Sequence, residues 1–170
     1  GSGPIGVKKH LADYLPAPLV GRDGDRFVYT DPAKSIGRVK LYAGQFLVLV
    51  RAWAYILLHG PDGLRRIADY SILNANYVRE RLKGAFDVPY GDKRCMHEFV
   101  ASAAAFKHNG VTAKDVAKAL LNAGFHAPTM SFPVAGTLMV EPTESESKME
   151  LDRFCDAMIA IREEIAAIEG

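Results

Sequence analysis

The chain has 170 residues, of which 49% are apolar and 24% are charged, the ordinary mixture of a soluble globular protein. This composition excludes intrinsic disorder, which needs few apolar residues or a strong charge imbalance. Its 21 Lys and Arg against 20 Asp and Glu leave a formal charge of +1, so charge gives no reason to expect nucleic acid or an anionic membrane as a partner. Two cysteines, Cys95 and Cys155, are too few for a disulfide framework and are expected to be reduced thiols.

The first forty residues predict irregular structure with short ordered pieces. Residues Lys8 to Leu15 predict a brief helix that Pro16 ends, and polar and apolar residues alternate from Arg26 to Thr30 as in a short strand. From Tyr42 to Leu58 the chain is almost continuously apolar. This run is shorter than the roughly 20 residues of a membrane span and carries Arg51 at its centre, so we expect a helix buried on most faces.

The remaining elements follow from caps, glycines and hydrophobic periodicity. A second helix is predicted from Asp62 to Lys83, ended by Gly84. Strands are predicted at 86–90, 95–101 and 136–141, with a loop or edge strand at 125–132. The capping pattern Thr112 to Asp115 predicts a helix ending at Ala123, and Thr143 to Glu146 predicts the cap of a last helix.

This order of elements predicts an α+β fold in which helices pack on one face of a mostly antiparallel sheet. Three segments are expected: a glycine-rich loop and irregular linker at 1–40, a helical pair at 41–84 and an α+β C-terminal domain at 85–170. Residues 41–170 are expected to form one compact unit.

The segment around His126 and Thr129 is the most promising for chemistry, because an imidazole and a hydroxyl flank Pro128 on a loop that could present both to a cleft. A purely structural hydrogen bond by His126 is the alternative. Arg38 and Arg51 could bind a carboxylate or phosphate, although Arg51 inside a buried helix is expected to pair internally.

Other polar residues predict structural roles. His97 and Glu98, on a strand, would point to opposite faces, which argues against a joint acid–base role. Asn74 and Asn76 lie in the middle of a helix, where asparagine is a poor helix former, and are expected to hydrogen-bond a cap or a neighbouring segment. No residue spacing typical of a metal site is present.

Gly1, Gly3 and Gly6 match the letters of a dinucleotide-binding fingerprint, but Pro4 lies within the motif and the required strand is not among these residues, so we do not expect a nucleotide site here. The glycines instead predict a loop whose backbone passes close to something bulky, such as a phosphate or another subunit.

Several longer motifs resemble the C-terminal portion of glycine dehydrogenase (decarboxylating), the P-protein family of the glycine cleavage system. They lie at 3–11, 72–77, 96–100, 124–133 and 138–146. The segment around Cys95 is most similar to the second subunit of the two-subunit prokaryotic form, whereas residues 133–139 are closer to the single-chain form.

The resemblance implies the small C-terminal domain of an aminotransferase-like (fold type I) pyridoxal-phosphate enzyme. The family decarboxylates glycine and passes the aminomethyl group to lipoyl H-protein. Its Schiff-base lysine belongs to a His-Lys pair upstream of the glycine-rich loop, before the first residue of this chain. Lys8 and Lys9 follow the loop and are not substitutes. The chain alone is therefore expected to hold no catalytic residue of its own, to lack covalent pyridoxal phosphate and to be inactive.

The resemblance also implies site residues and partners. Candidates that bind the cofactor are Gly3, Gly6, Gly37, Tyr42 and Gly44, and candidates on the substrate side are His126, Thr129 and Arg38. The expected partners are the N-terminal portion or other subunit of the P-protein, lipoyl H-protein and a second copy. The expected location is the cytoplasm of a prokaryote, or the mitochondrial matrix of a eukaryote. A non-catalytic subunit-interaction domain is the alternative function.

Overall fold

The computed structural model describes residues 3–41 and 44–168. Backbone contacts divide the chain into two units, Gly1–Gly60 and Pro61–Gly170. The division differs from the predicted segments, since it falls within the predicted helical pair 41–84 and splits the expected unit 41–170. The physical reason is a break at Gly60, whose φ of 61° and ψ of −177° interrupt the helix just before Pro61.

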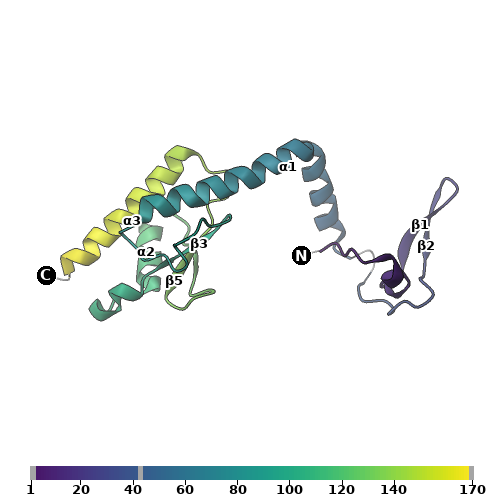
Figure 1. Ribbon diagram of the computed structural model, residues 1–170, viewed down its shortest axis with the longest axis horizontal. Helices are drawn as coiled ribbons and strands as arrows, with labels where there is room; N and C mark the ends of the chain where they lie inside the picture. Colours follow the sequence, from purple (N-terminus) through teal and green to yellow (C-terminus); the bar gives the residue numbers. More distant parts are fainter. Residues whose placement is uncertain (1–2, 42–43, 169–170) are drawn as a thin grey trace. The chain divides into compact units, whose positions relative to one another are not determined.

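The first unit contains a short 3₁₀ helix and a two-stranded ribbon (Figure 1). The 3₁₀ helix, η1, spans Lys9–Tyr14, close to the predicted helix. Strand β2, Arg26–Thr30, confirms the predicted strand and pairs antiparallel with β1, Leu19–Asp23. The sequence did not predict β1, because Gly21 interrupts its apolar residues and Pro18 stands immediately before it.

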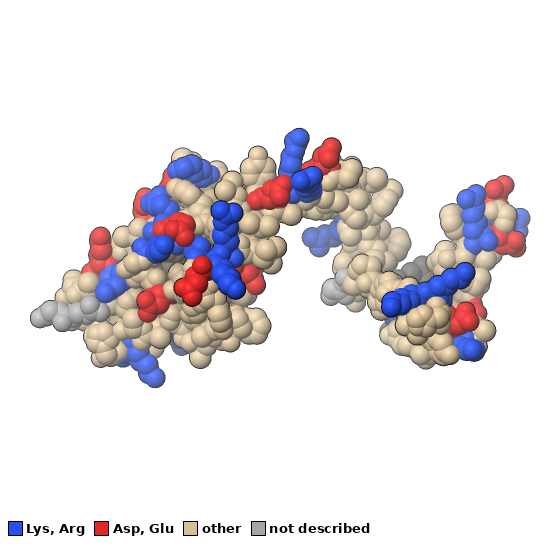
Figure 2. Space-filling view, in the orientation of Figure 1, with Lys and Arg blue, Asp and Glu red and all other residues tan. Residues whose placement is uncertain are grey.

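The long helix α1, Phe46–Leu82, belongs to both units, and its part up to Gly60 lies in the first. We expected this part to be buried, yet its apolar side chains are exposed: Leu47 by 74%, Trp53 by 64% and Leu58 by 80%. Apolar side chains surround the helix on every side, and the ribbon and short helix of the first unit are too small to cover them. Figure 2 shows few charges along it. Arg51 is also exposed, which corrects the expectation of a buried ion pair.

None of the helices in the described part of the chain is long and apolar enough to cross a membrane.

The second unit packs three helices against a three-stranded antiparallel sheet (Figure 1). The strands β3 (Phe99–Ser102), β4 (Thr129–Met130) and β5 (Thr137–Val140) follow the order β3-β5-β4. Phe99 lies opposite Val140, and Thr129 lies opposite Met139. The helices are the second part of α1, α2 (Ala113–Asn122) and α3 (Lys148–Ile168), with a 3₁₀ helix, η2, at Ala104–Asn109.

Two predicted strands are shorter or absent. Residues 86–90 form only isolated bridges, because Pro89 and the positive φ of Tyr90 (65°) turn the chain. The strand predicted from Cys95 begins only at Phe99. The edge strand predicted within 125–132 is β4, and the strand predicted at 136–141 is β5.

Helix caps are partly as predicted. The backbone N–H and hydroxyl of Thr112 both donate to the Asp115 carboxylate, at 3.0 and 2.6 Å, which confirms the predicted start of α2. These hydrogen bonds hold the pKa of Asp115 below its usual value. The cap of α3 is one turn later than predicted, because the Ser147 hydroxyl, rather than Thr143, accepts the backbone N–H of Glu150.

The helices and the sheet of the second unit each contribute fully buried side chains to its core. These are Leu82 from α1, Leu120 from α2, Leu138 from β5 and Cys155 and Met158 from α3. An ion-pair network also joins two helices, since Arg81 of α1 contacts Asp152 at 2.9 Å and Asp156 at 2.8 Å on α3.

The two cysteines are free thiols in different environments. Burial raises the pKa of Cys155 to about 11, and burial raises the pKa of Cys95 as well. At pH 8 Cys155 is therefore almost entirely the unreactive neutral thiol, and its sulfur also lies in the core, since the residue is 0% exposed.

We expect iodoacetamide to alkylate Cys95 well before Cys155 in the folded chain, as measured by mass spectrometry of peptides after quenching at intervals. In denaturant the two thiols should react at similar rates, which serves as the control. Alkylation of Cys155 first, under native conditions, would contradict the buried position of this thiol.

Candidate functional site

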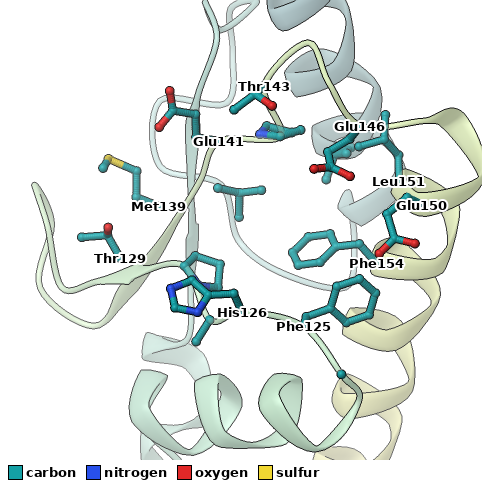
Figure 3. Close-up of a pocket in the computed structure, with 16 residues that line it drawn as sticks. Phe125, His126, Thr129, Met139, Glu141, Thr143, Glu146, Glu150, Leu151 and Phe154 are labelled. Atoms are coloured by element: carbon teal, nitrogen blue, oxygen red, sulfur yellow. The ribbon is translucent and has the colours of Figure 1, made fainter. Parts of the chain in front are cut away.

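The second unit contains a cavity of about 490 Å³ between the loop after α2, strand β5 and the start of α3 (Figure 3). We call it the His126 pocket. Its polar lining is formed by His126, Thr129, Glu141, Thr143, Glu146 and Glu150. Its apolar lining includes Val78, Phe125, Met139, Leu151 and Phe154. The pocket thus combines one imidazole, two hydroxyls and three carboxylates with an apolar wall.

The two residues predicted for the substrate side, His126 and Thr129, lie on the same wall of this pocket. Gly124 ends α2 with a φ of 83°, a conformation that favours glycine. The next residue, Phe125, packs edge-to-face on Phe154 at 5.4 Å between ring centroids, and the guanidinium of Arg153 lies 3.9 Å from the centre of its ring. These contacts anchor the loop, which exposes the side chain of His126 and leads into β4, whose first residue, Thr129, is also exposed.

The opposite wall comes from the segment between β5 and α3. A hydrogen bond from α1 holds the backbone of this segment, since the Asn74 side chain donates to the Thr143 carbonyl at 2.8 Å. Asn76 similarly donates to the Cys95 carbonyl at 2.8 Å and accepts from its N–H at 3.1 Å. Both asparagines therefore form the predicted hydrogen bonds between segments, and Asn74 holds one wall of the pocket.

The glutamates are functional candidates that sequence reasoning missed. The acidic run from Glu141 to Glu146 is a visible signal, but a loop gives no periodicity that would show which side chains face His126. Glu150 is engaged by Arg153, whose side chain donates to it at 2.9 and 2.5 Å and lowers the pKa of the carboxyl. Glu146 is exposed, and no residue of the described part of the chain forms an ion pair with it.

The pocket is electrostatically negative, because its lining residues, all within the described ranges, include three carboxylates but no lysine or arginine. A cationic or hydrogen-bond-donating group such as an amine is suited to this environment, whereas a carboxylate is not. His97 lies just outside, with its Nε2 3.9 Å from the Glu141 carboxylate and 4.0 Å from that of Glu98. Both His97 and Glu98 precede β3, so their expected placement on a strand was wrong.

The other predicted site residues belong to the first unit. Arg38 is exposed there, and Gly37 and Gly44 have φ angles of 90° and 77°, which favour glycine. Tyr42 lies outside the described residues. The structure therefore brings His126 and Thr129 together in one pocket, and Arg38 lies in the same unit as the glycines.

The glycines do not by themselves form a cradle for pyridoxal phosphate. A cofactor cradle would leave space that a Cβ fills against neighbouring atoms, but a Cβ at Gly3, Gly6 or Gly37 would meet nothing within 4 Å. At Gly44 it would meet only the Lys40 side chain, at 3.4 Å. Residues 3–41 and 44–168 also contain no group of three or more His, Cys, Asp or Glu placed to hold a metal ion.

Comparison with known proteins gives one consistent family. A family model described as the C-terminal domain of glycine dehydrogenase matches residues 67–170. The probable glycine dehydrogenase (decarboxylating) subunit 2 of Halalkalibacterium halodurans is 53% identical over 167 residues, which cover 96% of this chain and 34% of that protein. The glycine dehydrogenase (decarboxylating) of Roseobacter denitrificans is 53% identical over 172 residues, which cover 99% of this chain and 17% of that protein.

The fold also matches a solved structure. A crystal structure of glycine decarboxylase (P-protein) of the glycine cleavage system, in inhibitor-bound form, matches with a TM-score of 0.72 over 90% of this chain and 37% of that one, at 22% identity. This similarity confirms the predicted α+β fold class. The chain spans about a third of the length of the subunit 2 relatives that it matches.

Proposed function

Because the chain belongs to the glycine dehydrogenase (decarboxylating) family and forms a C-terminal part of it, we propose that it contributes the His126 pocket to an enzyme that decarboxylates glycine. In this proposal the whole enzyme transfers the resulting aminomethyl group to lipoyl H-protein. The observation that carries the proposal is that the family match includes every residue of the pocket, whose negative lining suits an amine.

The pocket binds the amine-bearing end of the reacting group. Glu146 has a free carboxylate that attracts an ammonium group, and the Thr129 hydroxyl can accept a hydrogen bond from it. The imidazole of His126 can accept a proton from the amine or return one, because a neutral imidazole has one donor and one acceptor nitrogen. Phe125 and Phe154 form the apolar wall, which suits a hydrocarbon arm that carries an aminomethyl group and limits the access of water.

The carboxylate of glycine needs a different site, since the lining of the His126 pocket has three carboxylates and neither lysine nor arginine. Arg38 remains our candidate for this carboxylate, because its guanidinium is exposed in the first unit. Pyridoxal phosphate, in this proposal, is held mainly by polypeptide other than the described residues, with the glycine-rich segment of the first unit beside it.

The exposed apolar part of α1, residues 46–58, supports a requirement for further polypeptide. A helix that is apolar on all sides is normally buried in a larger core. We propose that the rest of glycine dehydrogenase, or its other subunit, covers this segment in the bacterial cytoplasm. The same observation favours the second candidate function, a subunit-interaction domain without chemistry of its own.

Reconstitution distinguishes these two functions. We expect the 170-residue chain alone to show no exchange of labelled bicarbonate into glycine, and to restore this exchange when mixed with the polypeptide that forms the other two thirds of a subunit 2 relative, its partner subunit, pyridoxal phosphate and H-protein. Omitting the chain is the control. Binding of the chain without restored exchange would favour the interaction domain, and exchange that proceeds equally without the chain would refute the proposed contribution.

A further inference from the structure

A second cavity in the second unit, of about 330 Å³, has the opposite charge to the His126 pocket. Its charged lining consists of Arg79 from α1, Lys93 and Arg94 from the segment between α1 and β3, and one carboxylate, that of Glu98. We call it the Arg94 pocket. The two pockets share one lining residue, Met139, so the second is a separate site. A cavity with this excess of positive charge favours an anion.

Of the three cationic side chains that line this pocket, one is held by contacts within the chain and two can contact a ligand. The Arg79 side chain is only 11% exposed, and it donates to the carbonyl of Gly91 and, at 3.2 Å, to Glu80. It therefore holds the turn that forms one wall. Lys93 and Arg94 are exposed, and neither has a hydrogen-bond or ion-pair partner in the described part of the chain. Their donors are free to bind a ligand.

The turn from Val88 to Gly91 places an aromatic ring beside these cations. The Gly91 N–H donates to the Val88 carbonyl at 2.9 Å, and a Cβ on Gly91 would lie 2.8 Å from that carbonyl oxygen. Tyr90 has a φ of 65°, a conformation that normally selects glycine or asparagine at this position of a turn. Its side chain is nevertheless large and 80% exposed at the cavity. Folding gains little from this ring, which points to a role in binding.

We propose that the Arg94 pocket binds a small organic anion, with its phosphate or carboxylate group on Lys93 and Arg94 and its apolar or aromatic body against Tyr90. The volume lies within the range of small-molecule sites, and apolar side chains such as Phe99 and Met139 complete the wall. The charged side chains provide affinity through charge-assisted hydrogen bonds, and the ring selects for an apolar body. The proposal is independent of the function assigned to the His126 pocket.

Nuclear magnetic resonance of the ¹⁵N-labelled 170-residue chain tests this proposal. The probes are phenyl phosphate and benzoate, with inorganic phosphate and benzyl alcohol as matched compounds that lack the ring or the charge. We expect at least one aromatic anion to shift the amide signals of residues 93–95, and the tighter of the two identifies the preferred anionic group. Each matched compound should bind more weakly by about tenfold or more, because each forms only part of the contacts.

Variants assign the binding to the named residues. The double variant Lys93→Gln/Arg94→Gln should weaken binding of the preferred anion by about tenfold or more. Tyr90→Gly should weaken it as well, while the backbone accepts glycine readily at this φ. Lys107→Gln, which removes an exposed charge on η2, is the matched control and should leave binding unchanged. All of these side chains are exposed, and the amide spectrum itself reports whether each variant remains folded.

Three results would overturn the proposal. The first is the absence of shifts at residues 93–95 with ~10 mM of either aromatic anion, a concentration that would largely saturate a site with a Kd of ~1 mM. The second is equal binding by the double variant and the unmodified chain. The third is binding of inorganic phosphate or benzyl alcohol as tight as that of the preferred aromatic anion.

Discussion

Replacing Leu120 by alanine should lower the free energy of unfolding of the second unit by about 2–5 kcal/mol. Leu120 is 0% exposed on α2, within the same core cluster as Leu82, Leu138 and Met158. The substitution removes buried methyl groups and leaves a cavity that the surrounding helices and sheet can fill only in part. Urea denaturation followed by the helical circular dichroism signal measures the effect, since α2 and α3 both lie in this unit.

Leu121→Ala is the matched control, because it makes the same chemical change one residue along the same helix. The Leu121 side chain is 55% exposed, so its truncation should change the free energy of unfolding by only about 0.5 kcal/mol. Similar losses for the two variants would show that α2 does not face the core as described.

Elements with local signals could be predicted from the sequence. Helix α2 is an example, because Thr112 and Asp115 cap its start and Gly124 follows its end, all within one short segment. The loop or edge strand predicted at 125–132 has a similar basis, as Gly124 and Pro128 end regular structure there, and the structure forms a loop at His126 and strand β4 from Thr129. In both cases the decisive contacts are between residues that are close along the chain.

Burial of α1 could not be predicted in the same way, because it depends on what surrounds the helix. The apolar run up to Leu58 correctly predicts a helix. The sequence does not show which polypeptide packs against that helix. The first unit is too small for this purpose, so Trp53 and Leu58 remain exposed. The burial of α3 could be predicted, because its apolar residues form one side of the helix and share a core with Leu120 and Leu138 of the same unit.

The positions of the glutamates in the His126 pocket also could not be predicted from the sequence. Glu141, Glu146 and Glu150 reach the pocket through the end of β5, a loop and the first turn of α3. The antiparallel pairing of β4 with β5 and the hydrogen bond from Asn74 to Thr143 help to place these glutamates opposite His126. Contacts of this kind join residues far apart in the chain, and no local pattern encodes them.

His126→Ala should reduce glycine-dependent bicarbonate exchange by the reconstituted enzyme about 100-fold, the lower end of the range for loss of a general acid or base. The imidazole is exposed at the pocket, so its removal should not affect folding, and the loss should appear in the rate rather than in the amount of complex formed. His126→Gln keeps a hydrogen-bond donor but cannot transfer a proton at neutral pH. If His126 moves a proton, this variant should be as slow as His126→Ala.

A second exposed histidine in the same unit provides the control. His108 lies on η2, where its Nδ1 is 2.7 Å from the Ala105 carbonyl, and it is absent from the lining of the His126 pocket. His108→Ala should therefore leave the exchange rate unchanged. Exchange by His126→Ala within about twofold of the unmodified enzyme would remove the imidazole from the chemistry, since a proton-transfer role demands a far larger loss. A normal rate for His126→Gln alone would instead show that His126 acts by donating a hydrogen bond.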